Sequence, residues 1–182
     1  TRSFIAGHKD FGTLIALLHN GIPILGIINC PAHNERWLGS VNEHTLLNGK
    51  IINTSTTDSL EECYSFTSGL YFESRNGFRE GYDRLINRIK YHRFGGDCYM
   101  YGMLASGLID IVVEDTLKPH DYMALLPVIQ GAGGIATDGY GNKITLKSDG
   151  SFVASCSLNI HKQVIKILSL WIIFCTKIIG YK

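Results

Sequence analysis

The apolar residues in the N-terminal part of the chain form short runs separated by turn signals, a pattern typical of antiparallel strands. Between Phe11 and Cys30, two such runs flank Asn20-Gly21, and Asn-Gly is the strongest short signal for a hairpin. A third strand is expected over Glu35–Val41, and Asn48-Gly49 repeats the turn signal after it. Because both hairpin strands are almost continuously apolar, the pattern predicts a sheet covered on both faces.

In the middle of the chain, the spacing of apolar residues changes from that of a strand to that of a helix. Cys63–Gly69 has the composition of another short strand. From residue 81 to residue 94, apolar side chains recur at helical spacing with arginine and lysine on the other faces, which predicts an amphipathic helix packed on the sheet. Helices that alternate with strands in this way predict a layered α/β or α+β architecture.

Residues 95–134 are the stretch in which we expect the function, and they open on two adjacent glycines. Gly95 and Gly96 precede Asp97 and a predicted buried helix over Cys98–Ser106. Free backbone N–H groups at such a helix start could hold a phosphate or sugar hydroxyls. The alternative is an ordinary loop in which Asp97 only caps the helix.

Two further acidic residues lie at the ends of the next predicted elements. Ile109–Val113 is a predicted buried strand that delivers Glu114 to its carboxyl end, where α/β sheets usually bind ligands. The alternative for Glu114 is a solvated surface position. Asp121 follows Pro119 and would lie in the first turn of the next helix, where a carboxylate suits either a hard cation such as Mg²⁺ or the helix start alone.

Composition narrows the class of partner. A chain of 182 residues is long enough for a full core, in one domain or a domain and a half. The formal net charge is +1, with both signs mixed along the chain, so we expect neither nucleic acid nor a membrane surface as a partner. A small molecule is the expected partner. Repeats, low-complexity blocks and linker-like segments are absent from the sequence.

The cysteines and the two chain ends bear on location. The five cysteines are odd in number and include no C-x-x-C pair, which argues against a disulfide framework and fits a reducing cytoplasm. The sequence begins at Thr1 without the pattern of a signal peptide, and we expect it to start inside a longer protein. The apolar segment Ile165–Ile179 is interrupted by polar residues and is predicted to be a terminal helix, not a membrane span.

The central stretch closely resembles the inositol monophosphatase family of magnesium-dependent phosphomonoesterases. The resemblance rests on GDCYMYGMLASGLIDIVVE, on Asp121 seven positions after its last glutamate, and on the following GAGGIATDGYGN. The opening TRSF is similar to the end of that family's metal motif, and FGTLIALLHNGIPILGII and LLNGK also fall where the family has them. The resemblance covers residues 1–168 as the C-terminal two-thirds of one family domain and leaves 169–182 as an apolar tail of unknown role.

Within the family, the forms GGDCYxYG, TRSF and LKPxDYxALxPV are most similar to the histidinol-phosphatase branch. His120 departs from both branches, since inositol-specific members have tryptophan and histidinol-phosphatases have tyrosine before the aspartate. The resemblance implies the layered sandwich of the sugar phosphatases, incomplete at the N-terminus, and a Mg²⁺ cofactor. It also implies the hydrolysis of histidinol phosphate in histidine biosynthesis by a metal-activated water.

The residues of this chain that match the family's motifs have expected roles. The resemblance implies that Asp121 binds metal, that Thr1 orients the attacking water, and that Glu114 contacts the alcohol portion of the substrate. The remaining predicted substrate-binding residues are Gly95, Gly96 and Asp97.

The family's other acidic metal ligands would precede Thr1, so we expect little or no activity from this chain alone. Three functional alternatives stay open at this point. They are histidinol phosphate hydrolysis, inositol phosphate hydrolysis, and a non-catalytic fragment that could form a homodimer.

Overall fold

The computed structural model describes the backbone of residues 2–69 and 78–179 and the side chains of residues 3–69 and 78–169. Within these residues the chain forms two five-stranded sheets and six α-helices. The strands are β1 (Thr13–His19), β2 (Ile22–Cys30), β3 (Glu35–Ser40), β4 (Leu46–Leu47), β5 (Lys50–Ile51), β6 (Tyr64–Thr67), β7 (Tyr91–Phe94), β8 (Ile111–Glu114), β9 (Ile135–Thr137) and β10 (Phe152–Ser155). The helices are α1 (Arg2–Ile5), α2 (Phe78–Ile86), α3 (Tyr99–Ala105), α4 (Pro119–Tyr122), α5 (Leu125–Gly131) and α6 (Leu158–Ile179).

The first sheet, sheet A, is an antiparallel meander with the order β1-β2-β3-β4-β5. Its first turn has positive φ at both Asn20 (50°) and Gly21 (78°), as the tight hairpin turn of an Asn-Gly pair requires. Asn48 and Gly49 repeat the arrangement between β4 and β5. Both predicted hairpins and the third strand are therefore confirmed.

The second sheet, sheet B, is mixed and has the order β7-β6-β8-β10-β9. Strand β6 is parallel to β7 on one side and to β8 on the other, whereas β10 is antiparallel to β8 and β9. All four residues of β8 are buried, as the continuous apolar run predicts. The three parallel strands end at the same edge of the sheet, and this edge carries the site.

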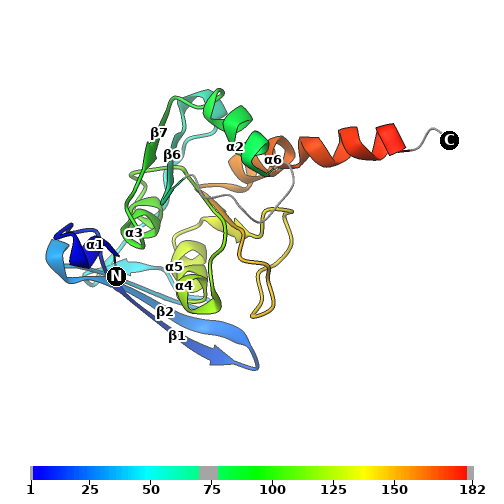
Figure 1. Ribbon diagram of the computed structural model, residues 1–182. Helices are drawn as coiled ribbons and strands as arrows, with labels where there is room; N and C mark the ends of the chain where they lie inside the picture. Colours follow the sequence, from blue (N-terminus) through cyan, green and yellow to red (C-terminus); the bar gives the residue numbers. More distant parts are fainter. Residues whose placement is uncertain (1, 70–77, 180–182) are drawn as a thin grey trace.

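Helices and sheets alternate in four layers (Figure 1). Helices α3, α4 and α5 lie between the sheets, and their apolar residues form one core with the inner face of sheet A and one face of sheet B. This close approach requires glycine on sheet A, because a Cβ on Gly26 would collide with the Ala124 carbonyl and a Cβ on Gly39 with the Pro127 carbonyl. The inner helices are thereby held close against sheet A.

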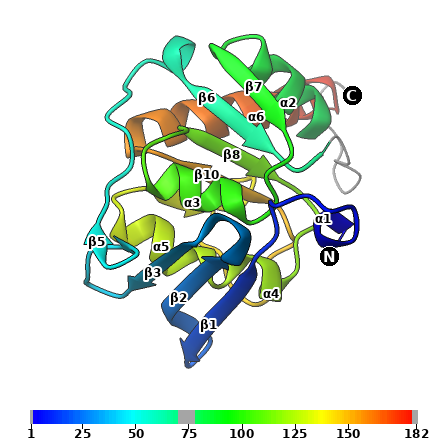
Figure 2. The ribbon, with the colours of Figure 1, turned by 90° about the vertical axis from the view of Figure 1, so that its left-hand side faces the viewer.

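Helices α2 and α6 cover the other face of sheet B and form a second core with it (Figure 2). The far end of α6 extends beyond the body of the molecule (Figure 1). No helix of the described part of the chain is both long enough and apolar enough to cross a membrane. The expectation of a layered α/β sandwich is confirmed.

Two local predictions are wrong. The helix expected over residues 81–94 ends at Ile86, and Tyr91–Phe94 is instead the edge strand β7. Backbone N–H groups of Lys90 and Tyr91 donate to the Cys63 carbonyl, so pairing with β6 overrides the helical spacing of the side chains. The helix expected from Asp121 is also divided into α4 and α5.

Within the part of the chain that the structure describes, the prediction that sheet A is covered on both faces is also wrong. Burial alternates along β1, and Ile15 and Leu17 on its outer face are 51% and 55% exposed. Leu14, Ala16 and Leu18 point the other way and pack on the core. Near-continuous apolar sequence therefore does not imply two-sided burial in this sheet.

Candidate active site at the edge of sheet B

A pocket of about 620 Å³ opens where the three parallel strands of sheet B end. Each strand continues directly into one part of the pocket wall, which is the edge at which α/β sheets usually bind ligands. The wall brings together five of the six predicted site residues. It is lined by Ser3, Thr67, Ser68, Gly69, Gly95, Gly96, Asp97, Glu114, Asp115, Thr116, Leu117 and Asp121.

The glycine loop after β7 has a left-handed backbone over three successive residues. The φ angles are 97° at Gly95, 111° at Gly96 and 46° at Asp97. A Cβ on Gly96 would lie 3.1 Å from the Cβ of Met100, so both the backbone angle and the packing favour glycine there. The Gly95 N–H donates to the Thr67 carbonyl at 2.8 Å, which ties the loop to the end of β6.

Asp97 lies at the exposed tip of this loop. Its Oδ1 accepts a hydrogen bond from the Cys98 N–H at 3.0 Å, and its Oδ2 accepts one from the Ser3 hydroxyl at 3.3 Å. The first bond is a local one just before α3, close to the capping alternative, while the side chain also lines the pocket. Asp97 therefore has both a structural contact and access to a ligand.

Glu114 is the last residue of β8 and is only 5% exposed, so a solvated surface position is ruled out for it. Its Oε1 accepts hydrogen bonds from the Thr67 hydroxyl at 2.9 Å and from the Ser68 N–H. Burial raises the pKa of the carboxyl group to about 7, against the lowering effect of these bonds and with a smaller raising effect of Asp97. Glu114 can therefore gain or lose a proton near neutral pH.

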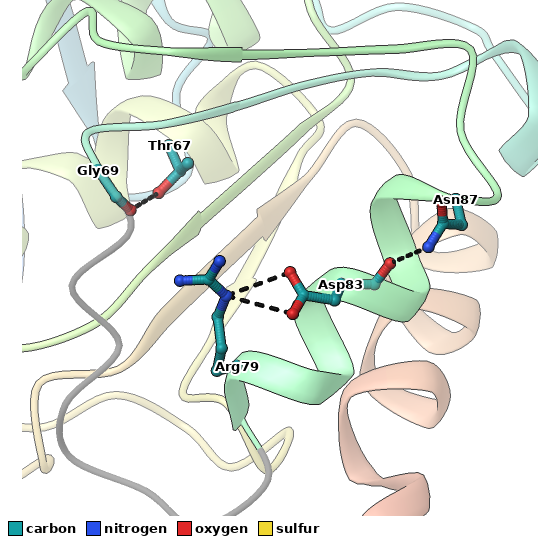
Figure 3. A network of polar contacts seen from close by, with 5 residues as sticks. All are labelled: Thr67, Gly69, Arg79, Asp83 and Asn87. Atoms are coloured by element: carbon teal, nitrogen blue, oxygen red, sulfur yellow. Dashed lines mark hydrogen bonds and ion pairs between the residues drawn. The ribbon is translucent and has the colours of Figure 1, made fainter.

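The Thr67 hydroxyl links Glu114 to the strand end behind it. Besides Glu114, it lies 3.3 Å from the Gly69 carbonyl oxygen, a contact drawn in Figure 3. A hydroxyl has one hydrogen to donate, so Thr67 donates either to Gly69 or to Glu114. An ionised Glu114 favours the second arrangement, because a hydrogen bond to a charged acceptor is the stronger one.

Helix α2, also seen in Figure 3, begins with a local ion pair. The Arg79 Nε lies 3.1 Å and 3.3 Å from the two carboxylate oxygens of Asp83, and the Asn87 amide donates to the Asp83 carbonyl at 2.7 Å. The pair is spaced i,i+4 and half-exposed, so its contribution is to helix α2. Asp83 is therefore a useful comparison carboxylate that does not line the pocket.

Asp121 lies in α4 with its side chain 42% exposed. Its Oδ2 accepts a hydrogen bond from the Lys118 N–H at 2.8 Å, which is a helix-capping contact. Its Oδ1 lies 3.8 Å from the His120 Nε2, and the residue lines the pocket. The capping alternative is thus correct for Oδ2, while Asp121 also has access to a ligand in the pocket.

Thr1 lies outside the described residues, and its expected role stays a prediction. Ser3, two positions later, lines the pocket and contacts Asp97, so the start of the described chain does reach the site.

The sequence did not predict seven of the twelve residues that line the pocket. Thr67 and Ser68 end an expected strand, but only the parallel pairing of β6 with β8 brings them to Glu114. Asp115 is buried directly after Glu114, and its Oδ1 accepts a hydrogen bond from the Thr116 N–H at 2.8 Å. The adjacent acidic pair was the available signal for Asp115.

Four carboxylates therefore line the pocket, from Asp97, Glu114, Asp115 and Asp121. Carboxylate oxygens are the donors that Mg²⁺ prefers, and Asp121 is the predicted metal-binding residue among these four. However, no group of three or more His, Cys, Asp or Glu side chains within the described residues is arranged to hold a metal ion. The residues present fit one part of a metal site and not a complete one.

Comparison with known proteins bears directly on this pocket. The profile of the inositol monophosphatase family matches residues 1–170, which is nearly the whole chain. The chain belongs to the inositol monophosphatase family. Members of this family are phosphoric monoester hydrolases. The family resemblance expected from the motifs is therefore confirmed.

Curated relatives agree with this assignment. The chain is 41% identical over 175 residues to the protein named bifunctional phosphatase IMPL2, chloroplastic, of Arabidopsis thaliana. The matched region covers 92% of the chain and 50% of that protein. It is 30% identical to a fructose-1,6-bisphosphatase/inositol-1-monophosphatase of Thermotoga maritima, over 93% of the chain and 64% of that protein. The chain therefore spans between half and two thirds of the length of these relatives.

Solved structures share the fold. An inositol monophosphatase from Zymomonas mobilis superposes with a TM-score of 0.88 at 36% identity and covers 92% of this chain and 66% of that one. An IMPase from Thermotoga maritima superposes with a TM-score of 0.82 at 28% identity, over 92% of this chain and 64% of that one.

Proposed function

We propose that the chain is part of a Mg²⁺-dependent phosphatase that hydrolyses histidinol phosphate to histidinol and phosphate. The observation that carries the proposal is the meeting of Asp97, Glu114 and Asp121, which come from three different structural elements, around one pocket. Histidinol-phosphatases of Chlorobaculum parvum and Mycobacterium tuberculosis are each 30% identical to the chain, over 58% and 64% of their lengths.

In this proposal Asp121 contributes one carboxylate to the metal site, and Thr1 orients the water. Bound Mg²⁺ would lower the pKa of a water molecule and hold the phosphate oxygens. The other acidic ligands must come from outside the described residues, because a single carboxylate holds Mg²⁺ only weakly. The chain alone is accordingly expected to show little or no activity.

Glu114 and the glycine loop would bind the alcohol portion of the ester. Histidinol carries an ammonium group and an imidazole, and a pocket lined by four carboxylates attracts a cation. An ionised Glu114 can accept a hydrogen bond from such a group, and a ligand cation would itself favour the ionised form. The acidic wall supports histidinol phosphate more than it supports a neutral polyol.

Inositol phosphate is the second candidate. The relatives include inositol monophosphatases, and the Zymomonas mobilis protein is 36% identical to the chain. Carboxylates can also accept hydrogen bonds from the hydroxyls of a polyol. The two substrates differ in charge, so a carboxylate in the pocket should matter more for histidinol phosphate.

The test compares phosphate release from histidinol phosphate and from inositol 1-phosphate, with and without Mg²⁺, by the protein extended by its upstream codons. We expect histidinol phosphate to be preferred and Asp121→Asn to lose roughly 10²- to 10³-fold in rate, because a group that stabilises charge is removed. Asp83→Asn is the matched control, since Asp83 lies on α2 outside the pocket.

The contrary result is equally clear. The non-catalytic alternative would be established if neither ester releases phosphate, with or without Mg²⁺. Asp121→Asn would then be indistinguishable from the parent. The codons before Thr1 give an independent check. An open frame with Asp-Gly next to Thr1 and further acidic residues upstream supports the enzyme, and a stop there contradicts it.

Three broader expectations, about the substrate, the oligomeric state and the compartment, belong to the same proposal. We infer a small-molecule phosphate ester as the partner, and a homodimer remains a prediction. A reducing compartment such as the cytoplasm fits the four described cysteines, which are all free and buried. The relative from Arabidopsis thaliana is named as chloroplastic, which makes an organelle the alternative to test by fractionation.

A further inference from the structure

Two cysteines that are far apart in sequence meet behind the glycine loop. Cys98 directly follows Asp97, and Cys30 is the last residue of β2 in sheet A. Cys98 is 6% exposed and Cys30 is fully buried, and both belong to the core between the sheets. The two thiols interact directly, and this contact together with burial raises the pKa of Cys98.

The two sulfur atoms lie next to Gly12. A Cβ built on Gly12 would lie 2.6 Å from the Cys98 Sγ and 3.0 Å from the Cys30 Sγ, so both atoms border the same small space. The absence of a side chain at Gly12 leaves room for them. Both cysteines are free in this structure.

A second pair of buried cysteines provides a comparison. Cys63 and Cys156 belong to the other core, between sheet B and the outer helices. Their thiols donate to backbone carbonyls, Cys63 to Ser59 at 3.4 Å and Cys156 to Thr57 at 3.7 Å. Neither residue lines the pocket.

We propose that Cys30 and Cys98 form a redox pair, and that their oxidation to a disulfide distorts the Gly95–Asp97 loop of the pocket. The formation of the disulfide stands by itself. Its effect on turnover rests on the proposed phosphatase function, because only then is the loop a substrate-binding element.

The reaction balances with a peroxide as the oxidant. The Cys98 sulfur attacks one oxygen of hydrogen peroxide, the O–O bond breaks, and a sulfenic acid and water are formed. The Cys30 sulfur then attacks the Cys98 sulfur, the S–S bond forms, the S–O bond breaks, and a second water leaves. Two thiols lose two electrons in total, and the peroxide gains them. The raised pKa of Cys98 keeps the thiolate scarce at neutral pH, so the step is slow and the resting pair is reduced.

Distortion of the loop follows from how the two cysteines are held. An S–S bond is about 2.05 Å long, far shorter than a contact between two unbonded sulfur atoms. Cys30 is fixed at the end of β2, a strand that is paired with both β1 and β3, and it lies opposite Glu35 of β3. Cys98 follows a loop whose Gly96 carbonyl accepts hydrogen bonds from the N–H groups of Tyr99 and Met100. Cys98 is therefore the partner that moves, and the loop moves with it.

The chemistry is tested on the chain after treatment with hydrogen peroxide and alkylation of the remaining thiols. We expect peptide mapping to find a Cys30–Cys98 linked peptide that disappears on treatment with dithiothreitol. Cys98→Ser and, separately, Cys30→Ala should abolish the link. The double variant Cys63→Ser/Cys156→Ser should keep it. The absence of the linked peptide in the parent, or a link through Cys63, Cys156 or Cys175 in its place, would overturn the proposal.

The structural consequence is tested by amide hydrogen exchange over residues 94–99. We expect the exchange of the Gly95–Asp97 amides to change on oxidation in the parent and in the Cys63→Ser/Cys156→Ser variant, and not in Cys98→Ser. Unchanged exchange in the linked protein would overturn the coupling to the pocket.

Activity is then measured on the extended protein. Oxidation should lower kcat/KM about 10- to 100-fold and reversibly, because small misplacements of binding groups have effects of this size. If the reduced protein releases no phosphate at all, the proposed function fails, while the linked peptide and the exchange data still decide the redox pair.

Discussion

The two sheets are built from similarly apolar strands, yet they are buried differently. Sheet B lies between the inner helices and the pair α2 and α6, and every residue of β8 and β10 is buried. Among the described residues, helices pack on the inner face of sheet A but not on its outer face, and burial alternates along β1. The difference teaches that apolar runs identify strands more reliably than they identify what covers the strands.

The exposed face of sheet A is itself apolar. By register, Ile15 lies opposite Ile27, which lies opposite Leu38, and Leu17 lies opposite Leu25. A continuous apolar patch of this kind is unusual on a solvent face. Because this face is exposed, its contribution to the free energy of unfolding should be small compared with that of the buried faces. Substitutions on the two kinds of face can measure the difference.

The largest expected effect comes from placing a charge in the fully covered sheet. Val112 is completely buried in β8, between Phe66 of β6 and Ala154 of β10. We expect Val112→Asp to lower the free energy of unfolding by about 4 kcal/mol or more, because an unpaired carboxylate is buried. Urea denaturation measures the loss. Leu17→Asp in sheet A is the matched change and should cost less than about 1 kcal/mol, and equal losses would remove the distinction between the sheets.

The next largest effect comes from Glu114, whose carboxyl group is buried at the edge of sheet B. The pKa of Glu114 is raised to about 7, so the folded state binds the proton more tightly than the unfolded chain does. The associated stability is present below the unfolded pKa of about 4.5 and is lost as the pH rises through 7. At pH 8, Glu114→Gln should therefore be more stable than the parent by about 2–3 kcal/mol.

Denaturant unfolding at pH 4.5 and at pH 8 measures this effect, and the advantage of Glu114→Gln should be small at the lower pH. Glu61→Gln is the control, since Glu61 is exposed on the surface near Arg88 and its pKa is lowered, first by a backbone hydrogen bond. An advantage that is independent of pH would contradict the raised pKa of Glu114.

A smaller effect separates the two faces of one strand. Leu14 points to the inner face of sheet A and packs on the core, while its neighbour Ile15 is 51% exposed on the outer face. We expect Leu14→Ala to cost about 2 kcal/mol and Ile15→Ala less than about 1 kcal/mol, because only the first removes buried contacts. Thermal or urea unfolding of the two variants measures the two losses in stability and so checks their ratio. A larger loss for Ile15→Ala would show that the outer face is the better covered one.

These contrasts also show what could be predicted from the sequence. The hairpins follow from Asn20-Gly21 and Asn48-Gly49, because the turn chemistry is local. The placement of Glu114 at the end of a buried strand follows from a continuous apolar run before it. The glycine loop is recognisable from two adjacent glycines and the family resemblance together.

What could not be predicted depends on contacts between distant segments. Tyr91–Phe94 is a strand only because β6 offers it an edge, and its own spacing suggests a helix. Thr67 and Ser68 reach Glu114 through the parallel order of β6 and β8, which local patterns do not contain. The open face of sheet A is likewise a property of neighbours, since Leu14 and Ile15 are equally apolar in sequence.

The smallest expected change in stability is on the outer face itself. The double variant Ile15→Thr/Leu17→Thr places two β-branched residues in β1 and removes apolar surface from the exposed side. We expect its free energy of unfolding to stay within about 1 kcal/mol of the parent, while its self-association, measured by sedimentation over a range of concentrations, falls. Leu14→Thr is the control on the inner face. It should lower the free energy of unfolding by about 2 kcal/mol and leave self-association unchanged. If the double variant instead loses as much as Leu14→Thr, the outer face is buried in solution. A dimer that dissociates in parallel would then place the predicted homodimer interface on this face.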